Sequence, residues 1–149
     1  MAQESHVNHI RDGRLPDGMQ VIFLPGHAFE MTGYITPDGN AYIGDAVYEL
    51  IVRERVLAEG NRQVNKLHKE STKYVNAAAQ AELIMRIEDK LTDEEKAIYK
   101  RGRNANAHAA PKNQDVIAYR KSTGFEALIG WLYLRNDMDR IMELIGERE

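Results

Sequence analysis

The sequence TGFEALIGWLYL, residues 123–134, is apolar on nearly every face when it is drawn as a helix. A helix of this kind is buried on most of its surface. One acid, Glu126, nevertheless lies inside the apolar run. Ionised carboxylates are almost never fully buried unless they pair with a cation. Glu126 is therefore a candidate functional residue.

A second acid, Asp45, stands among apolar residues in YIGDAV, residues 42–47. The preceding Gly44 would let another backbone or a ligand approach closely. Each acid has a structural alternative. Asp45 could cap its helix or pair with an arginine, and Glu126 could lie in the first turn of its helix, where the helix dipole stabilises an acid. Together the two acids favour a site for a hard divalent cation such as Mg²⁺, which binds carboxylate oxygens and keeps several waters. Glu49 shares a helix face with Asp45, but we interpret it as a solvated surface residue.

Helical periodicity runs through the chain from Ala41 onward, and no internal repeat or heptad pattern accompanies it. Thr92 and Glu95 have the spacing of a capping box, which marks a helix start. The pattern predicts an all-α body of one domain. The expected helices cover residues 41 to a stop at Gly60, then 64–69, 72–76, 77–87, 92–102, 117–136 and 138–145.

The first forty residues differ from the rest because they are rich in proline and glycine. Residues 16–18 and 37–40 have turn composition, and residues 19–24 read as a short strand. We therefore divide the chain into an N-terminal extension, 1–40, whose role the sequence does not give, and a domain spanning 41–149.

Composition sets limits on the class of protein. The chain has 149 residues, no cysteine and no apolar run long enough for a signal peptide or a membrane span. We expect a soluble cytoplasmic protein. The histidines lack metal-ligand spacing, and neither a phosphate-binding glycine loop nor a nucleophile elbow is present.

Charge is distributed unevenly along the chain. The net charge of −3 argues against a nucleic-acid partner when it is read alone, but residues 100–121 carry +5 and the rest of the chain −8. The segment 103–115 is expected to form an exposed loop or a helix interruption, and loops of that size often bind ligands. The polar and basic residues expected to contact phosphates are Lys100, Arg101, Arg103, Asn104, Lys112 and Arg120.

Several ordered motifs resemble a known family. YIGDAVYE at 42–49 is similar to the first acidic motif of ribonuclease III catalytic domains, and FEALIG at 125–130 to their second. The intervening segments resemble Mini-ribonuclease III, a bacterial branch without a separate double-stranded-RNA-binding domain. These segments are LHKES at 67–71, KRGRNA at 100–105, PKNQD at 111–115 and YRKSTGFE at 119–126.

The resemblance implies a ribonuclease III-type helical endonuclease domain that works as a homodimer. It implies Mg²⁺ held by Asp45 and Glu126 as metal-binding and catalytic residues, with double-stranded RNA cut to 5′-phosphate and 3′-hydroxyl ends. The substrate it implies is precursor 23S ribosomal RNA. Ala41 and Thr123 occupy places where ribonuclease III proper has further acids, which leaves the number of metal ions open.

Two other functions fit parts of the sequence. A domain of this fold that has lost two acids could bind RNA or ribosomes without cutting. An all-α nucleotide pyrophosphohydrolase also gathers magnesium between helices, but it requires several acids at helical spacing. Glu143 and Glu147, on the terminal helix, are the nearest approach to such a pattern.

Overall fold

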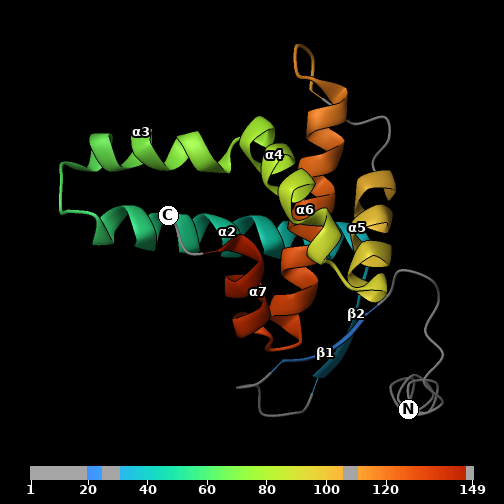
Figure 1. Cartoon of the computed structure of the whole chain (residues 1–149). Coiled ribbons are helices and arrows are strands. Elements are labelled where there is room, and N and C mark those ends of the chain that lie inside the picture. The colour runs from blue at the N-terminus through green and yellow to red at the C-terminus, as the bar shows by residue number, and fades with distance from the viewer. Residues whose placement is uncertain (1–19, 25–30, 106–110, 147–149) are drawn as a thin grey trace.

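The computed structural model describes residues 20–24, 31–105 and 111–146. Figure 1 shows helices packed around α6 (Val116–Leu134), with α2 (Pro37–Ala58) crossing it and α5 (Asp93–Ala105) alongside. The all-α body is confirmed. The remaining helices are α3 (Val64–Val75), α4 (Ala77–Ile87), the short 3₁₀ turn η1 (Glu88–Lys90) and α7 (Met138–Ile145).

Helix α6 is the centre of the core. It contacts α2, α4, α5 and α7, which explains why its sequence is apolar on nearly every face. Phe125, Leu128 and Ile129 are completely buried. The ring of Phe125 packs edge-on against Tyr48 of α2, with centroids 5.0 Å apart. The central part of this helix therefore has little solvent-facing surface.

Helix α2 begins earlier than expected. Residues 37–40, which have turn composition, form its first turn. Thr36 is the N-cap and its Oγ1 accepts from the Gly39 amide at 3.2 Å, while Pro37 occupies the first helical position. A threonine followed by proline starts helices as readily as it makes turns. The expectation of a turn here was wrong.

Two other helix boundaries also differ from expectation. Residues 64–75 form one continuous helix instead of two short pieces, and α5 extends through Ala105 beyond the expected stop near Gly102. Asn76 separates α3 from α4, with extended backbone and a side chain that accepts from the Ala79 amide at 2.9 Å. A helix N-cap, and not a glycine or proline, makes this corner.

The expected strand is present and has a partner. β1 (Gln20–Leu24) pairs antiparallel with β2 (Met31–Ile35), and Ile22 lies opposite Gly33. Residues 1–19 and 25–30 of the N-terminal extension, including the turn expected at 16–18, lie outside the described residues. The second strand was missed because it is short and carries a glycine in its middle. The division of the chain at residue 40 stays a prediction.

A buried ion pair fastens α5 to α7. The expected capping box forms, with Glu95 Oε2 accepting from the Thr92 amide at 2.8 Å and Thr92 Oγ1 accepting from the Glu95 amide at 3.2 Å. The same Glu95 carboxylate, 5% exposed, accepts two hydrogen bonds from the Arg140 guanidinium at 2.8 and 2.9 Å. The contact with Arg140 lowers the pKa of Glu95 below its usual range, and the capping hydrogen bonds with Thr92 add to this effect.

In the part of the chain that the structure covers, no helix combines the length and the apolar character required to cross a lipid bilayer.

Candidate active site

Two glycines bring α2 and α6 into backbone contact. A Cβ atom added to Gly44 would lie 1.7 Å from the carbonyl oxygen of Glu126, and one added to Gly130 would lie 1.8 Å from the carbonyl oxygen of Asn40. Only glycine fits such positions. The close approach seen from Gly44 therefore explains why Asp45 and Glu126 come from neighbouring points on two different helices.

The two acids influence each other electrostatically. Burial raises the pKa of Glu126 to about 7, and the nearby negative charge of Asp45 adds to this effect. A hydrogen bond from the Gln80 side chain works in the opposite direction. The pKa of Asp45 is also raised, first by burial and then by the charge of Glu49. Both groups would gain from a cation placed between them.

The structural alternatives for the two acids are not supported. Asp45 lies in the middle of α2, whose N-cap is Thr36, so it caps nothing. Glu126 lies well inside α6, far from its N-cap Asp115. Within the described ranges, no ion pair to an arginine or lysine involves either acid. Neither capping, nor the helix dipole, nor pairing therefore accounts for them.

The surroundings of Asp45 differ from what its sequence neighbours suggest. Asp45 is exposed, and so are its neighbours Tyr42 and Ala46, whereas Glu126 is half-buried. The apolar residues flanking Asp45 therefore do not enclose it. One acid faces solvent while the other lies deeper between helices, and this arrangement leaves the pair open to a large substrate.

Glu49 has another partner. Its carboxylate accepts from Arg53 Nε at 3.1 Å, one helical turn along α2. This is an ordinary surface ion pair, in line with the interpretation of Glu49 as a solvated residue. Ala41 and Thr123 stand where ribonuclease III proper has two further acids. Ala41 is buried, and Thr123 Oγ1 donates to the Tyr119 carbonyl at 3.1 Å.

Sequence reasoning missed a third polar group, Gln80. This residue is 1% exposed, and its Nε2 donates to the Val75 carbonyl at 3.2 Å. Its Oε1 is buried and has no hydrogen-bond partner in the structure. Helical spacing could have found it, because Gln80 shares the apolar face of α4 with Leu83, Ile84 and Ile87. Among residues with described positions, no three His, Cys, Asp or Glu side chains form a metal-binding group, so neutral oxygens would have to complete one.

A second glycine contact positions the basic residues. A Cβ on Gly102 would lie 2.4 Å from the Ala127 side chain, and one on Gly124 would lie 2.7 Å from the Tyr99 ring. These contacts hold the end of α5 against the part of α6 on either side of Glu126. The segment 100–104 is thereby placed beside the part of α6 that carries Glu126.

The structure brings three of the expected phosphate-binding residues together. Arg120 on α6 donates from Nε to the Arg103 carbonyl at 3.3 Å and from its terminal nitrogen to Asn104 Oδ1 at 3.2 Å. The Arg103 guanidinium lies 5.7 Å from the centre of the Tyr99 ring. Lys100 and Arg101 are exposed on α5, and Lys112 is exposed in the turn before α6. Residues 106–110 of the expected loop lie outside the described residues.

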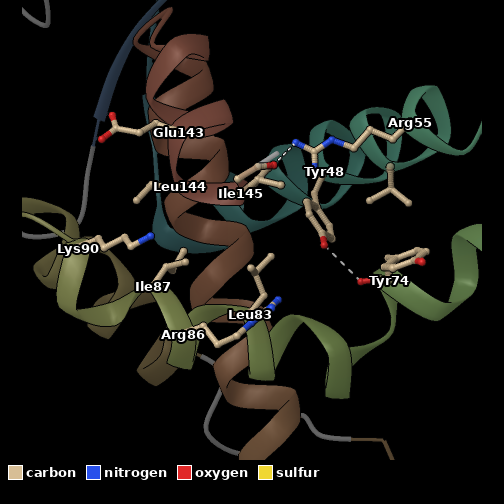
Figure 2. A pocket seen from close by; sticks show the side chains of 12 residues that line it. Tyr48, Arg55, Tyr74, Leu83, Arg86, Ile87, Lys90, Glu143, Leu144 and Ile145 are labelled. Atoms are coloured by element: carbon tan, nitrogen blue, oxygen red, sulfur yellow. Dashed lines mark hydrogen bonds between the residues drawn. The ribbon is translucent and has the colours of Figure 1, made fainter. Parts of the chain in front are cut away.

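A separate cavity of about 540 Å³ opens between α2, α4, α7 and the end of α3 (Figure 2). Two hydrogen bonds border it, from the Tyr48 hydroxyl to the Tyr74 carbonyl at 3.4 Å and from Arg55 to the Gly146 carbonyl at 2.7 Å. Its lining includes neither Asp45 nor Glu126. The acidic pair is therefore not part of this cavity.

Comparison with known proteins identifies the family of this chain. A model of the ribonuclease III domain matches residues 39–137. The chain is 51% identical to Mini-ribonuclease 3 of Thermoanaerobacter sp. (strain X514) over 105 residues, which are 70% of this chain and 74% of that protein. The chain belongs to the Mini-ribonuclease III branch of the ribonuclease III family. A second member, from Streptococcus pneumoniae, is 50% identical and covers 71% of this chain and 84% of its own length.

Membership in the family makes this chain an endoribonuclease. The X-ray crystal structure of a protein from Fusobacterium nucleatum is also similar, with a TM-score of 0.67 and 31% identity, covering 73% of this chain and 87% of that one. The ribonuclease III assignment and the all-α fold are thus confirmed. The match to residues 39–137 contains both acidic motifs and the basic end of α5.

Proposed function

We propose that this endoribonuclease cleaves double-stranded RNA by Mg²⁺-dependent hydrolysis at Asp45 and Glu126. The observation that carries the proposal is that two acids from different helices lie close enough to repel each other. No cationic side chain in the described structure forms an ion pair with either acid. Unpaired carboxylates in such a place are stabilised best by a bound cation.

The residues present fit a hard divalent cation. Two carboxylates and nearby neutral oxygens are the donors that Mg²⁺ accepts, with water filling its remaining positions. When bound, Mg²⁺ supplies Lewis acidity and lowers the pKa of an attached water. Asp45 and Glu126 would hold it.

The chain's own residues divide the remaining work. Exposed Asp45 would hold the cation where a substrate can reach it, whereas half-buried Glu126 lies deeper between the helices. The cations Lys100, Arg101 and Lys112 face solvent and would contact phosphates. Arg120 orients the end of α5 through its hydrogen bonds to Arg103 and Asn104. It would therefore have a structural role in addition to a role in RNA binding. Hydrolysis would leave a 5′-phosphate and a 3′-hydroxyl.

A duplex substrate suits the shape of this surface. A-form RNA exposes phosphates and 2′-hydroxyls across a wide, shallow minor groove, which proteins recognise chiefly by shape. Two copies of the chain would place two sites toward opposite strands. Tyr42, 80% exposed and three residues before Asp45, is a large aromatic side chain available to a second copy. We propose a homodimer acting on precursor 23S ribosomal RNA in the cytoplasm.

The test uses plain duplex RNA with and without Mg²⁺, comparing the wild type with Asp45→Asn. The variant should lose cleavage by at least about 10³-fold while it folds and binds RNA normally, because it removes a metal ligand and no phosphate contact. An RNA- or ribosome-binding module without activity would show binding but no Mg²⁺-dependent products from the wild type. Equal turnover by Asp45→Asn and wild type would reject the proposed site.

A further inference from the structure

The Gln80 amide is a buried polar group that contacts one acid of the pair, Glu126. Its side chain makes a hydrogen bond to the Glu126 carboxylate and donates from Nε2 to the Val75 carbonyl at 3.2 Å. A carboxylate can only accept, so both contacts use the amide N–H groups. Gln80 thus links the end of α3 to an acid on α6.

The oxygen of the same amide has no partner. Gln80 is 1% exposed, and its Oε1 makes no hydrogen bond in the structure. Buried amide oxygens are nearly always satisfied, by protein groups or by ordered water. Because the nitrogen end of this amide contacts Glu126, its oxygen also lies beside the acidic pair. The unsatisfied acceptor therefore lies close to Glu126, one of the two acids proposed to hold the cation.

A structural role accounts for the nitrogen of the Gln80 amide but not for its oxygen. Donation to the Val75 carbonyl satisfies a helix-end acceptor and would explain why a polar side chain lies at this position. It does not explain an acceptor left without a donor. Waters on a divalent cation are strong hydrogen-bond donors, and neighbours that accept from them orient the metal's surroundings.

We propose that Gln80 is a positioning residue of the Asp45–Glu126 site, whose amide N–H holds the Glu126 carboxylate and whose Oε1 accepts from a water in the cation's hydration shell. The inference rests on the proposed function, because it assumes that the two acids bind the ion. It gives the site a third oxygen-bearing side chain, whereas Ala41 and Thr123 supply no carboxylate.

The test measures metal binding without RNA. Mn²⁺, followed by electron paramagnetic resonance, serves as the probe for wild type, Gln80→Leu and Gln80→Glu. We expect Gln80→Leu to weaken Mn²⁺ binding by about 10- to 100-fold, the usual effect of losing such a neighbour. Gln80→Glu restores an oxygen acceptor, but an ionised carboxylate can donate neither to the Val75 carbonyl nor to Glu126. It should therefore bind Mn²⁺ much better than Gln80→Leu, whereas a purely structural role predicts that both variants are equally impaired.

Two controls separate the possible failures. Asn40 is also a buried amide with an unpartnered oxygen, yet it has no hydrogen bond to either acid, so Asn40→Ala should lower stability without changing Mn²⁺ affinity. Gln80→Met replaces Gln80→Leu if the latter fails to fold. Unchanged Mn²⁺ affinity in folded Gln80→Leu or Gln80→Met overturns the role of Gln80, provided that Asp45→Asn abolishes binding. If Asp45→Asn also binds Mn²⁺ normally, the proposed metal site itself is rejected.

Discussion

Neutralising Glu126 should stabilise the metal-free protein at alkaline pH. Its folded pKa of about 7 lies above the ordinary value of 4.5, so the folded state holds this proton more tightly than the unfolded state does. The associated stability is fully present below pH 4.5 and is lost as the pH rises through about 7. The shift corresponds to about 3 kcal/mol. Glu126→Gln remains neutral and avoids this loss, so its advantage over wild type should grow from near zero at pH 4.5 to about 3 kcal/mol at pH 8.

Urea unfolding in EDTA at pH 5, 6, 7 and 8 measures this difference. Glu82→Gln on α4 serves as the matched control, because Glu82 is exposed on the solvent side of its helix. Saturating Mg²⁺ at pH 8 should then stabilise wild type but not Glu126→Gln, since ligand binding to the folded state adds to its stability. Equal stabilities of wild type and Glu126→Gln across this pH range would show that burial and Asp45 do not hold the proton, and would refute the reasoning.

Three further predictions concern the scaffold and the basic surface. Gly130→Ala should destabilise the fold by about 3 kcal/mol or more and reduce cleavage, because its Cβ would lie 1.8 Å from a carbonyl oxygen of α2. Thermal melts and RNA cleavage assays measure the two effects. A variant with the melting temperature of the wild type would contradict the prediction. Arg140→Met should cost about 3–5 kcal/mol in urea unfolding at pH 7. Because the pKa of Glu95 is lowered, the loss should shrink as the pH falls below 4.5, and a pH-independent loss would count against the ion pair. Replacing Arg101 and Arg103 with alanine should reduce the salt dependence of RNA affinity by about one phosphate contact each, whereas an unchanged slope would remove them from the RNA surface.

The sequence predicted the helical body and the candidate acids for a physical reason. A helix surrounded by four others needs apolar residues on nearly every face, so α6 stands out, and Glu126 is conspicuous within it. Asp45 was found by its apolar sequence neighbours, although the structure leaves it exposed. Its position beside Glu126 depends on the crossing of two helices, which no local pattern describes.

Features that depend on tertiary contacts were harder to predict. Helical spacing places Gln80 on the apolar face of α4, but only its packing reveals that its side-chain oxygen is buried without a hydrogen-bond partner. Glu95 was identified as half of a capping box, but its ion pair with Arg140 joins residues far apart in the chain. The start of α2 was misplaced because proline is used both in turns and at the first position of helices.

The glycine crossing of α2 and α6 has a consequence for how this enzyme can change over time. Because backbone meets backbone at Gly44 and Gly130, the spacing of the helices there does not depend on the size of any side chain. Substitutions elsewhere in the core can alter volume and stability while the distance between the two acids is preserved. The catalytic geometry can therefore remain constant as the surrounding sequence diverges, so long as these two positions keep no side chain.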